Sequence, residues 1–211
     1  MTGPGPGGRR RYHHGDLREA LIETSIELLG ERDIQAFSMA EASRRLGVAV
    51  AAPYRHFADR EDLLAAVAVR AAELLGQQLD REVVAADPAE RLAAAAGCYV
   101  RFAAAQRPLF QALAGSGLDK QRHPEIIRAA AALGQVFLTP AIALAGRGET
   151  AAARLSSAVV ATAHGHATLL LDGTFGTGPA AATTAAGQAE AAARALIDGR
   201  SRLTQPRPPT S

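Results

Sequence analysis

The chain has 211 residues, of which 48% are hydrophobic, enough for one large domain or for a small domain joined to a larger one. Aromatic residues make up 4%, tryptophan is absent and cysteine occurs once, so the composition favours helices packed through small side chains and excludes an internal disulfide and a cysteine-based zinc site. The net charge of +2 is too small to indicate a nucleic-acid partner by itself, and the lack of a leader or of about 18 uninterrupted apolar residues predicts a cytoplasmic protein without a membrane span.

Both ends of the chain are expected to be flexible. Residues 1–12 are rich in Gly, Pro and Arg and predict a basic arm, in which Arg10 and Arg11 are candidates for DNA contact; a solvated tail is the equal alternative. Residues 200–211 predict a second tail. Residues 1–62 hold nine Arg against ten Asp and Glu, so phosphate binding requires that basic and acidic side chains lie on separate faces.

Apolar periodicity and capping residues predict an all-α fold of two domains. The first covers residues 13–62 and holds three short helices, and a long fourth helix joins it to an all-helical domain over residues 63–199. Pro140 should kink the 124–145 helix or end it early. The expected helices lie at about 16–30, 38–46, 49–57, 59–86, 89–105, 108–114, 124–145, 150–172 and 180–197.

Residues 38–57 have the plan of a helix-turn-helix, in which a short helix and a glycine turn precede a second helix that enters the major groove of DNA. Gly47 can adopt the positive φ that the turn requires. We name Gly47–Phe57, GVAVAAPYRHF, the recognition segment. Before Tyr54 it offers no side-chain hydrogen-bond donor or acceptor, and a helix pair with a glycine turn is common, so an ordinary core helix is the alternative.

The stretch FSMAEASRRLGVAVAAPYRHFADREDLL resembles the signature of the tetracycline-repressor (TetR) family of bacterial transcription regulators. The resemblance implies a homodimeric repressor with an N-terminal DNA-binding domain and a helical C-terminal domain that binds a small-molecule effector. It implies that Ser38 caps the second helix and touches phosphate, and that Tyr54 and His56 contact the DNA backbone. Arg60 stands where the family usually has Lys, and Ala49 where it commonly has a Ser that opens the recognition helix.

Direct reading of bases is expected to be sparse. Val50 and Ala51 can touch thymine methyl groups, whereas Arg45 and Arg55 are the candidate polar readers. The missing N–H of Pro53 should distort the first turn of the recognition helix without abolishing the helix. The full set of candidate DNA contacts is Arg10, Arg11, Ser38, Arg45, Ala49, Val50, Ala51, Pro53, Tyr54, Arg55, His56 and Arg60.

The second domain offers candidates for a ligand and for a dimer interface. The stretch around His164-Gly165 resembles a TetR subgroup in which a His-Gly pair precedes a Leu-rich stretch, although this chain lacks the Trp that usually precedes the pair. Small residues throughout helices 150–172 and 180–197 predict that these helices pair with a second copy as a four-helix bundle. The candidate ligand contacts are Phe102, Phe110, Phe137, His164 and Thr168, with plain core packing as the alternative for the aromatic residues.

Metal binding and catalysis are not expected. His164 and His166 are two residues apart and point about 200° apart on a helix, so they cannot share an ion. The sequence has no Gly-rich phosphate loop, no G-x-S-x-G turn and no H-E-x-x-H, so we expect no enzyme and no cofactor. The expected partners are a palindromic DNA operator, a second copy of the chain and an apolar or amphipathic effector. The alternative is a helical interaction module of the same fold without sequence-specific DNA binding.

Overall fold

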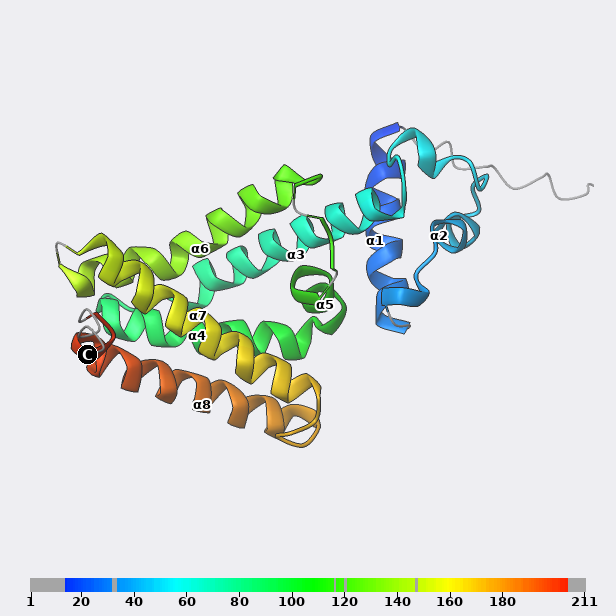
Figure 1. Cartoon of the computed structure of the whole chain (residues 1–211). Helices are drawn as coiled ribbons and strands as arrows, with labels where there is room; N and C mark the ends of the chain where they lie inside the picture. The colour runs from blue at the N-terminus through cyan, green and yellow to red at the C-terminus, as the bar shows by residue number, and fades with distance from the viewer. Residues whose placement is uncertain (1–13, 32–33, 116, 120, 147, 205–211) are drawn as a thin grey trace, which may run out of the picture.

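Every regular element of the computed structural model is helical across the residues that the structure describes, 14–31, 34–115, 117–119, 121–146 and 148–204 (Figure 1). The elements are α1 (His14–Glu31), η1 (Ile34–Ala36), α2 (Met39–Leu46), η2 (Pro53–Arg55), α3 (Arg60–Glu82), α4 (Pro88–Ala105), α5 (Arg107–Gly115), α6 (Pro124–Ala145), α7 (Glu149–Leu171), α8 (Gly178–Asp198) and α9 (Arg200–Thr204).

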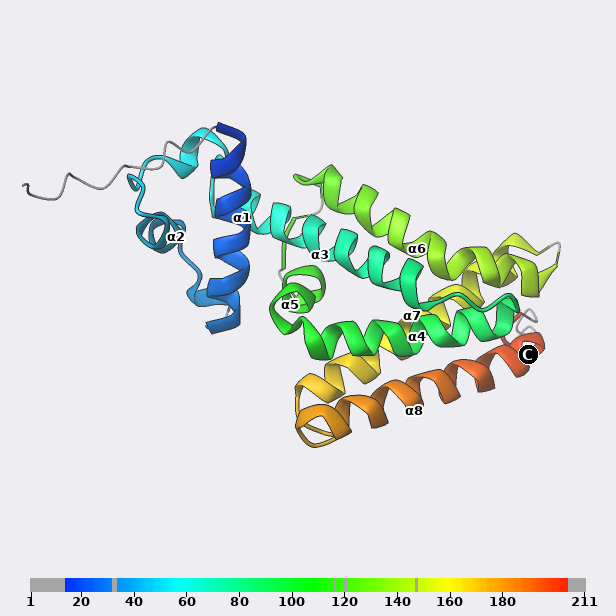
Figure 2. The same ribbon diagram turned by 180° about the vertical axis from the view of Figure 1, so that it is seen from behind.

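Helices α1 and α2 form a small unit with the first turns of α3 at one end of the molecule (Figures 1 and 2). Leu21 of α1, Met39 of α2 and Leu63 of α3 are buried in its core. Gly47 ends α2 with a φ of 69°, a left-handed conformation that a glycine adopts without a steric penalty. The unit therefore presents α2 and the recognition segment on the outer side of α1.

Helix α3 belongs to both parts of the molecule, because its first turns pack on α1 and its later turns pack on α5 and α6. The carboxylate of Asp59 caps it by accepting a hydrogen bond from the N–H of Asp62, at 3.0 Å. The helix ends at Glu82 and not near residue 86 as predicted. Val83 leaves the helical conformation, and the Arg91 side chain donates to the carbonyl of Ala85 at 2.9 Å, which holds the connection to α4 outside the helix.

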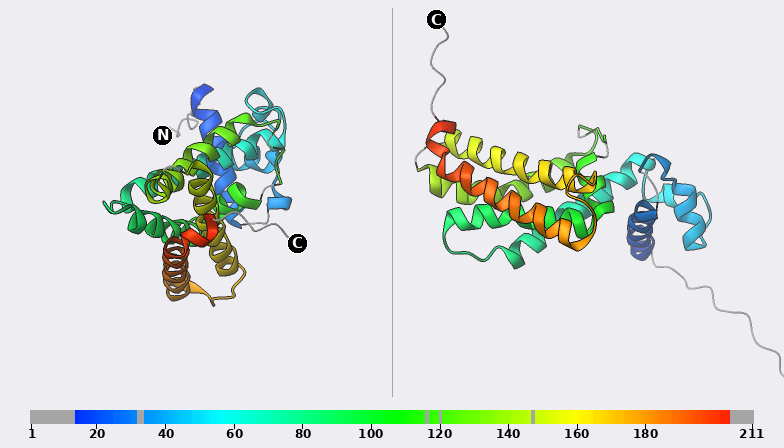
Figure 3. Two further views of the ribbon diagram at one scale, coloured as in Figure 1. Left: turned by 60° about the vertical axis from the view of Figure 1, so that its left-hand side comes forward. Right: turned by 90° about the horizontal axis from the view of Figure 1, so that it is seen from below.

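Helices α4, α6, α7 and α8 form a bundle that is the larger part of the fold (Figure 3). The most extensive packing joins α4 to α8, although more than 70 residues of sequence separate them. Gly97 of α4 allows this approach, because Glu190 of α8 fills the space where a side chain would stand. Glu190 accepts a hydrogen bond from Arg101 at 3.1 Å, so the close contact carries an ion pair across the two helices.

Helix α6 is, among the described residues, long and apolar enough by length and composition to cross a membrane. The same test is passed by helices of helical bundles, and α6 packs on α3, α4 and α7 with Phe137 in the core. Pro140 does not end it early, because the helix continues to Ala145. Pro140 is itself buried, so packing against neighbouring helices compensates for the hydrogen bond that the proline cannot donate.

Beyond α3, the predicted helix boundaries differ little from those in the structure. The five helices expected between residues 89 and 197 begin and end within two residues of α4 to α8. The prediction that the tail begins at residue 200 is wrong, because Arg200–Thr204 forms α9, which contacts α7 and α8. The Arg200 guanidinium donates to the carbonyl of Ile197 at 3.0 Å and joins α9 to the end of α8.

Candidate functional site

The recognition segment does not form the α-helix that its spacing predicts. Ala52 donates its N–H to the carbonyl of Ala49 at 2.8 Å, and residues Pro53–Arg55 form a single turn of 3₁₀-helix, η2. An α-helix beginning at Ala49 would need an N–H at position 53, which proline lacks, and the alanine side chain cannot cap a first turn. Tighter hydrogen bonds between residues three apart take over, so the expected distorted helix is replaced by two consecutive turns.

The outer surface of the recognition segment combines five of the candidate DNA contacts. Val50 and Tyr54 are 53% and 57% exposed, far more than expected of large hydrophobic side chains in a core. Pro53 and Phe57 are buried beneath them and anchor the segment to the core of the unit. The candidates that share this exposed surface are Ala49, Val50, Ala51, Tyr54 and Arg55.

Other candidate DNA contacts are engaged within the protein. Arg45 donates from both terminal nitrogens to the carboxylate of Glu31, each at 2.7 Å. Arg60 donates to the backbone carbonyls of Phe37 and Ile34 and lies 5.8 Å over the Phe37 ring, so it fastens the chain before α2 to the start of α3.

Two further described candidates, Ser38 and His56, also lie outside this exposed surface. Ser38 occupies the N-cap of α2 as expected, but its hydroxyl makes no capping hydrogen bond. The Nε2 atom of His56 is buried and has no hydrogen-bond partner among the described residues, so this imidazole edge faces inward and not toward DNA. Arg10 and Arg11 lie outside the described residues.

His56 faces a cavity of about 470 Å³ at the junction of the two domains. His123 also lines this cavity. It is 3% exposed and lies 3.3 Å from a carboxylate oxygen of Glu125 and 3.7 to 3.8 Å from those of Glu61 and Asp62. The neighbouring Arg122 is ion-paired to Asp59 and Glu61 at 2.9 and 2.6 Å. The loop before α6 is therefore tied by several charged contacts to the first turn of α3, directly after the recognition segment.

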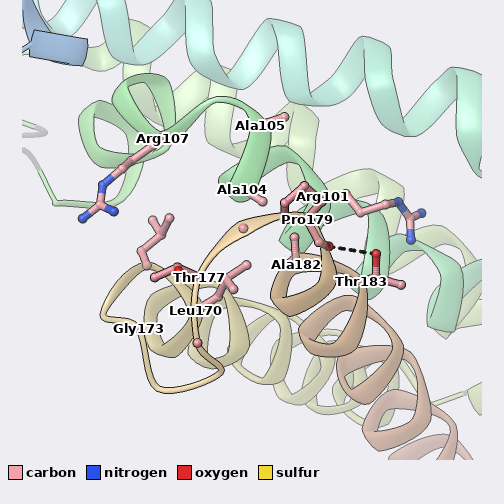
Figure 4. Close-up of a pocket in the computed structure, with 13 residues that line it drawn as sticks. Arg101, Ala104, Ala105, Arg107, Leu170, Gly173, Thr177, Pro179, Ala182 and Thr183 are labelled. Carbon is pink, nitrogen blue, oxygen red and sulfur yellow. Dashed lines mark hydrogen bonds between the residues drawn. The ribbon is translucent and has the colours of Figure 1, made fainter.

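A second cavity, of about 570 Å³, lies in the second domain between the start of α5 and the connection between α7 and α8 (Figure 4). Its volume is in the range of small-molecule sites, and most of its lining is apolar. Its walls come from the end of α4, the start of α5 and the connection between α7 and α8. The lining residues are Arg101, Ala104, Ala105, Arg107, Leu170, Leu171, Gly173, Gly176, Thr177, Gly178, Pro179, Ala182 and Thr183. We name it the α5 cavity.

None of the five candidate ligand residues lines the α5 cavity. Phe102, Phe110 and Phe137 are at most 4% exposed and belong to the hydrophobic core. His164 Nδ1 lies 3.1 Å from the Tyr99 hydroxyl, so the pair satisfies two polar groups inside the bundle. Thr168 is exposed on α7.

The sequence did hold a signal for the α5 cavity. The glycine-rich stretch GTFGTGP marks the break between α7 and α8, and Arg107-Pro108 marks the break before α5. We interpreted both only as helix boundaries, whereas they supply much of the cavity wall. No group of three or more His, Cys, Asp or Glu side chains within the described ranges could hold a metal ion.

A small unit with the plan of a helix-turn-helix, joined by one long helix to a helical bundle, is typical of a class of DNA-binding regulators. Residues 21–67 match the family model of bacterial regulatory proteins of the tetR family, and residues 92–197 match the model of the tetracyclin repressor-like C-terminal domain. These matches cover more than half of the chain. The chain belongs to the TetR family of DNA-binding transcriptional regulators.

Several solved structures are similar to this chain. A protein of unknown function from Rhodococcus sp. RHA1 is 30% identical, with a TM-score of 0.74 over 90% of this chain and 98% of that chain. A possible TetR family regulator from Streptomyces coelicolor A3(2) is 22% identical, with a TM-score of 0.66 over 88% and 99%. RolR in complex with its ligand resorcinol is 22% identical, with a TM-score of 0.57 over 92% and 96%. The last two share the fold. No curated protein matches the chain.

Proposed function

We propose that this TetR regulator is a homodimeric repressor that binds a palindromic operator and leaves it when a small molecule binds the second domain. The observation that carries the DNA-reading role is the exposed surface of the recognition segment, where Val50 and Tyr54 project over the buried Pro53 and Phe57. With few polar side chains there, most affinity comes from phosphate contacts and part of the specificity from groove shape.

Selection of bound duplexes from a random pool tests the operator. We expect enrichment of a palindrome whose half-sites are about one turn of DNA apart, roughly 34–36 Å. Tyr54→Phe should weaken binding to all sequences, because it removes a phosphate contact, whereas Val50→Ala should relax the preference at one base pair. Enrichment of no palindrome would contradict the proposal.

Salt dependence separates the repressor from a helical interaction module that does not bind DNA specifically. Phosphate contacts release counterions, so repressor affinity for the selected duplex should fall steeply between low and physiological salt. The scarcity of polar groups before Tyr54 favours the module. A weak affinity that does not distinguish the selected duplex from a scrambled one would support it.

The dimer is proposed to form through α7 and α8. Both helices have an exposed face of small residues, and at Gly165 and Gly187 an added Cβ would meet no atom within 4 Å. Such faces allow two helices to approach closely. Ala191→Glu on this face of α8 should produce monomers in light scattering, whereas Ala130→Glu on the exposed side of α6 should leave the dimer intact. If both variants remain dimers, the proposed interface through α7 and α8 is wrong.

The α5 cavity is the proposed effector site. Its volume and apolar lining suit a small organic molecule, and the complex of RolR with resorcinol supports effector binding in a protein of this fold. The proposed conformational change is a tilt of α3 that alters the spacing of the two recognition segments in the dimer.

We further propose that the chain acts in the cytoplasm without enzymatic activity or a cofactor, as is general for TetR regulators. We also propose that the chain belongs to the subgroup with Trp-His-Gly in this domain, because its His164-Gly165 pair precedes a Leu-rich stretch. An effector that binds the protein and leaves operator affinity unchanged would contradict the proposed release mechanism.

A further inference from the structure

The α5 cavity lies next to a direct contact between the two domains. Arg107 lines the cavity as the first residue of α5, and Pro108 follows it. A Cβ built on Gly30 of α1 would lie 3.4 Å from Cγ of Pro108, so the proline ring packs against the last turn of α1. Helix α5 also packs against α3, the helix that follows the recognition segment. Arg107 in the cavity wall and Pro108 at the contact with α1 are adjacent residues. A bound molecule that shifts α5 therefore also shifts its contact with the DNA-binding unit.

The charges around the α5 cavity favour an anion. Two of its lining side chains are cationic and none is anionic. The guanidinium of Arg101 is satisfied by Glu82 and Glu190, each at 3.1 Å. Arg107 is exposed and, among the described residues, forms no ion pair. Figure 4 shows its side chain beside α5, on the other side of the cavity from Arg101, with the guanidinium pointing outward from the other lining residues. One long, unpaired cation at the opening of an apolar cavity can bind one anionic group by a charged hydrogen bond.

The other lining residues of the cavity indicate the chemistry of the rest of the ligand. Leu170 and Leu171 of α7, Ala104 of α4 and Ala182 of α8 contribute apolar surface. Two threonines lie on the α8 side: Thr177, the N-cap residue of α8, and Thr183, whose Oγ1 already donates to the carbonyl of Pro179 at 3.0 Å (Figure 4). These walls favour a hydrocarbon or aromatic body without further polar groups, because an unpaired buried polar group is costly.

We propose that the α5 cavity binds an amphipathic monoanion, a carboxylate with an apolar body, and that Arg107 recognises the carboxylate while Pro108 transmits its presence to Gly30. The inference rests on the proposed effector-released repressor and names the effector class and the contact that couples the two domains.

Calorimetric titration of the full chain tests the ligand class. The probes are octanoate, decanoate and 2-naphthoate, each paired with its neutral amide. We expect at least one acid to bind about tenfold more tightly than its amide, and Arg107→Gln to weaken that acid by about tenfold without affecting the amide. Arg128→Gln, which removes an exposed arginine from α6, is the matched control and should bind like the wild type. Failure of all three acids to bind, or equal affinity of acids and amides, would overturn the ligand class.

Fluorescence anisotropy with the selected operator duplex tests the coupling. The acid that binds should weaken operator binding by the wild type and by Pro88→Ala, a control proline at the start of α4. Pro108→Ala should still bind the acid and the operator, but the acid should change its operator affinity by less than half as much on a logarithmic scale. An unchanged response in Pro108→Ala would overturn the route through α5. Operator binding without acid binding contradicts only this inference, whereas absence of operator binding contradicts the proposed function itself.

Discussion

Gly97 leaves no room for a side chain on α4, because Glu190 of α8 already occupies that space. A Cβ at position 97 would lie 2.1 Å from Oε1 and 2.6 Å from Cγ of Glu190. Displacing Glu190 would also break its ion pair with Arg101. The residue therefore sets the distance between the two helices that pack most extensively.

Gly97→Ala should destabilise the protein by about 1–3 kcal/mol, the usual cost of overpacking a tight contact. Gly76→Ala in α3 is the matched control, since a Cβ there meets nothing within 4 Å and alanine favours helix by about 1 kcal/mol. Urea unfolding followed by circular dichroism measures both. Equal stability of the two variants would show that the Glu190 side chain moves aside without cost.

Cys98 should be unreactive in the folded protein. Burial, with a smaller contribution from the negative charge of Glu82, raises the pKa of its thiol to about 12. A raised pKa keeps the thiol protonated and poorly nucleophilic throughout the physiological range. A thiol-specific chromogenic disulfide at pH 8 should label it slowly in buffer and rapidly in denaturant. Rapid labelling of the folded protein would mean that α4 opens locally.

At the level of elements, the helix boundaries were largely predictable and the recognition segment was not. Prolines and glycines lie at or near the boundaries of helices α4 to α8, and their effect on the backbone is local and strong. The sequence of the recognition segment pointed in two directions. Its spacing, which matches the TetR signature, favours a helix, whereas Ala49 and Pro53 weaken the first turn of that helix. Spacing alone does not show which indication prevails.

The cavity was harder to predict than the helices. The candidate phenylalanines have the composition of a ligand pocket, but long-range packing buried them in the core. The α5 cavity forms because a loop after α7 meets the start of α5, more than 60 residues earlier in the chain. Such a meeting depends on tertiary structure and leaves no periodic pattern in the sequence.

Pro53→Ala should extend helical structure through the recognition segment, because it supplies the missing N–H for the carbonyl of Ala49. We expect the ¹³Cα shifts of residues 50–56 to move toward helical values and the new amide at position 53 to gain protection from exchange. Pro179→Ala at the start of α8, where proline is well tolerated, is the control and should leave α8 unchanged. Unchanged shifts in residues 50–56 would show that packing, and not the proline, sets the turns.

At the scale of the whole molecule, Arg122 joins the two domains by its ion pairs with the first turn of α3. Its hydrogen bond, together with that from the Asp62 amide, lowers the pKa of Asp59. A carboxyl group with a lowered folded pKa stabilises the fold above its unfolded pKa, and this contribution is lost as pH falls through the folded pKa. Both side chains are nearly half exposed, so solvent screening makes the contribution small.

Arg122→Gln should therefore raise the pKa of Asp59 toward its ordinary value, as followed by NMR titration of the side-chain carboxyl. Arg194→Gln is the matched control, because it should raise the pKa of Glu90, which Arg194 lowers, and leave Asp59 unchanged. We also expect faster amide exchange in the first turn of α3 only in Arg122→Gln. An unshifted Asp59 would show that the ion pair does not persist in solution.

The pairing of α4 with α8 has a consequence for synthesis on the ribosome. The face of α4 that packs on α8 is covered only after α8, the last long helix, has emerged. Domains generally fold as units in the order of their synthesis, so the DNA-binding unit can fold while the second domain is still incomplete. A chain truncated within the connection before α8 would retain a recognition segment and expose an unpaired apolar helix. We expect such a fragment to aggregate rather than act as an unregulated repressor.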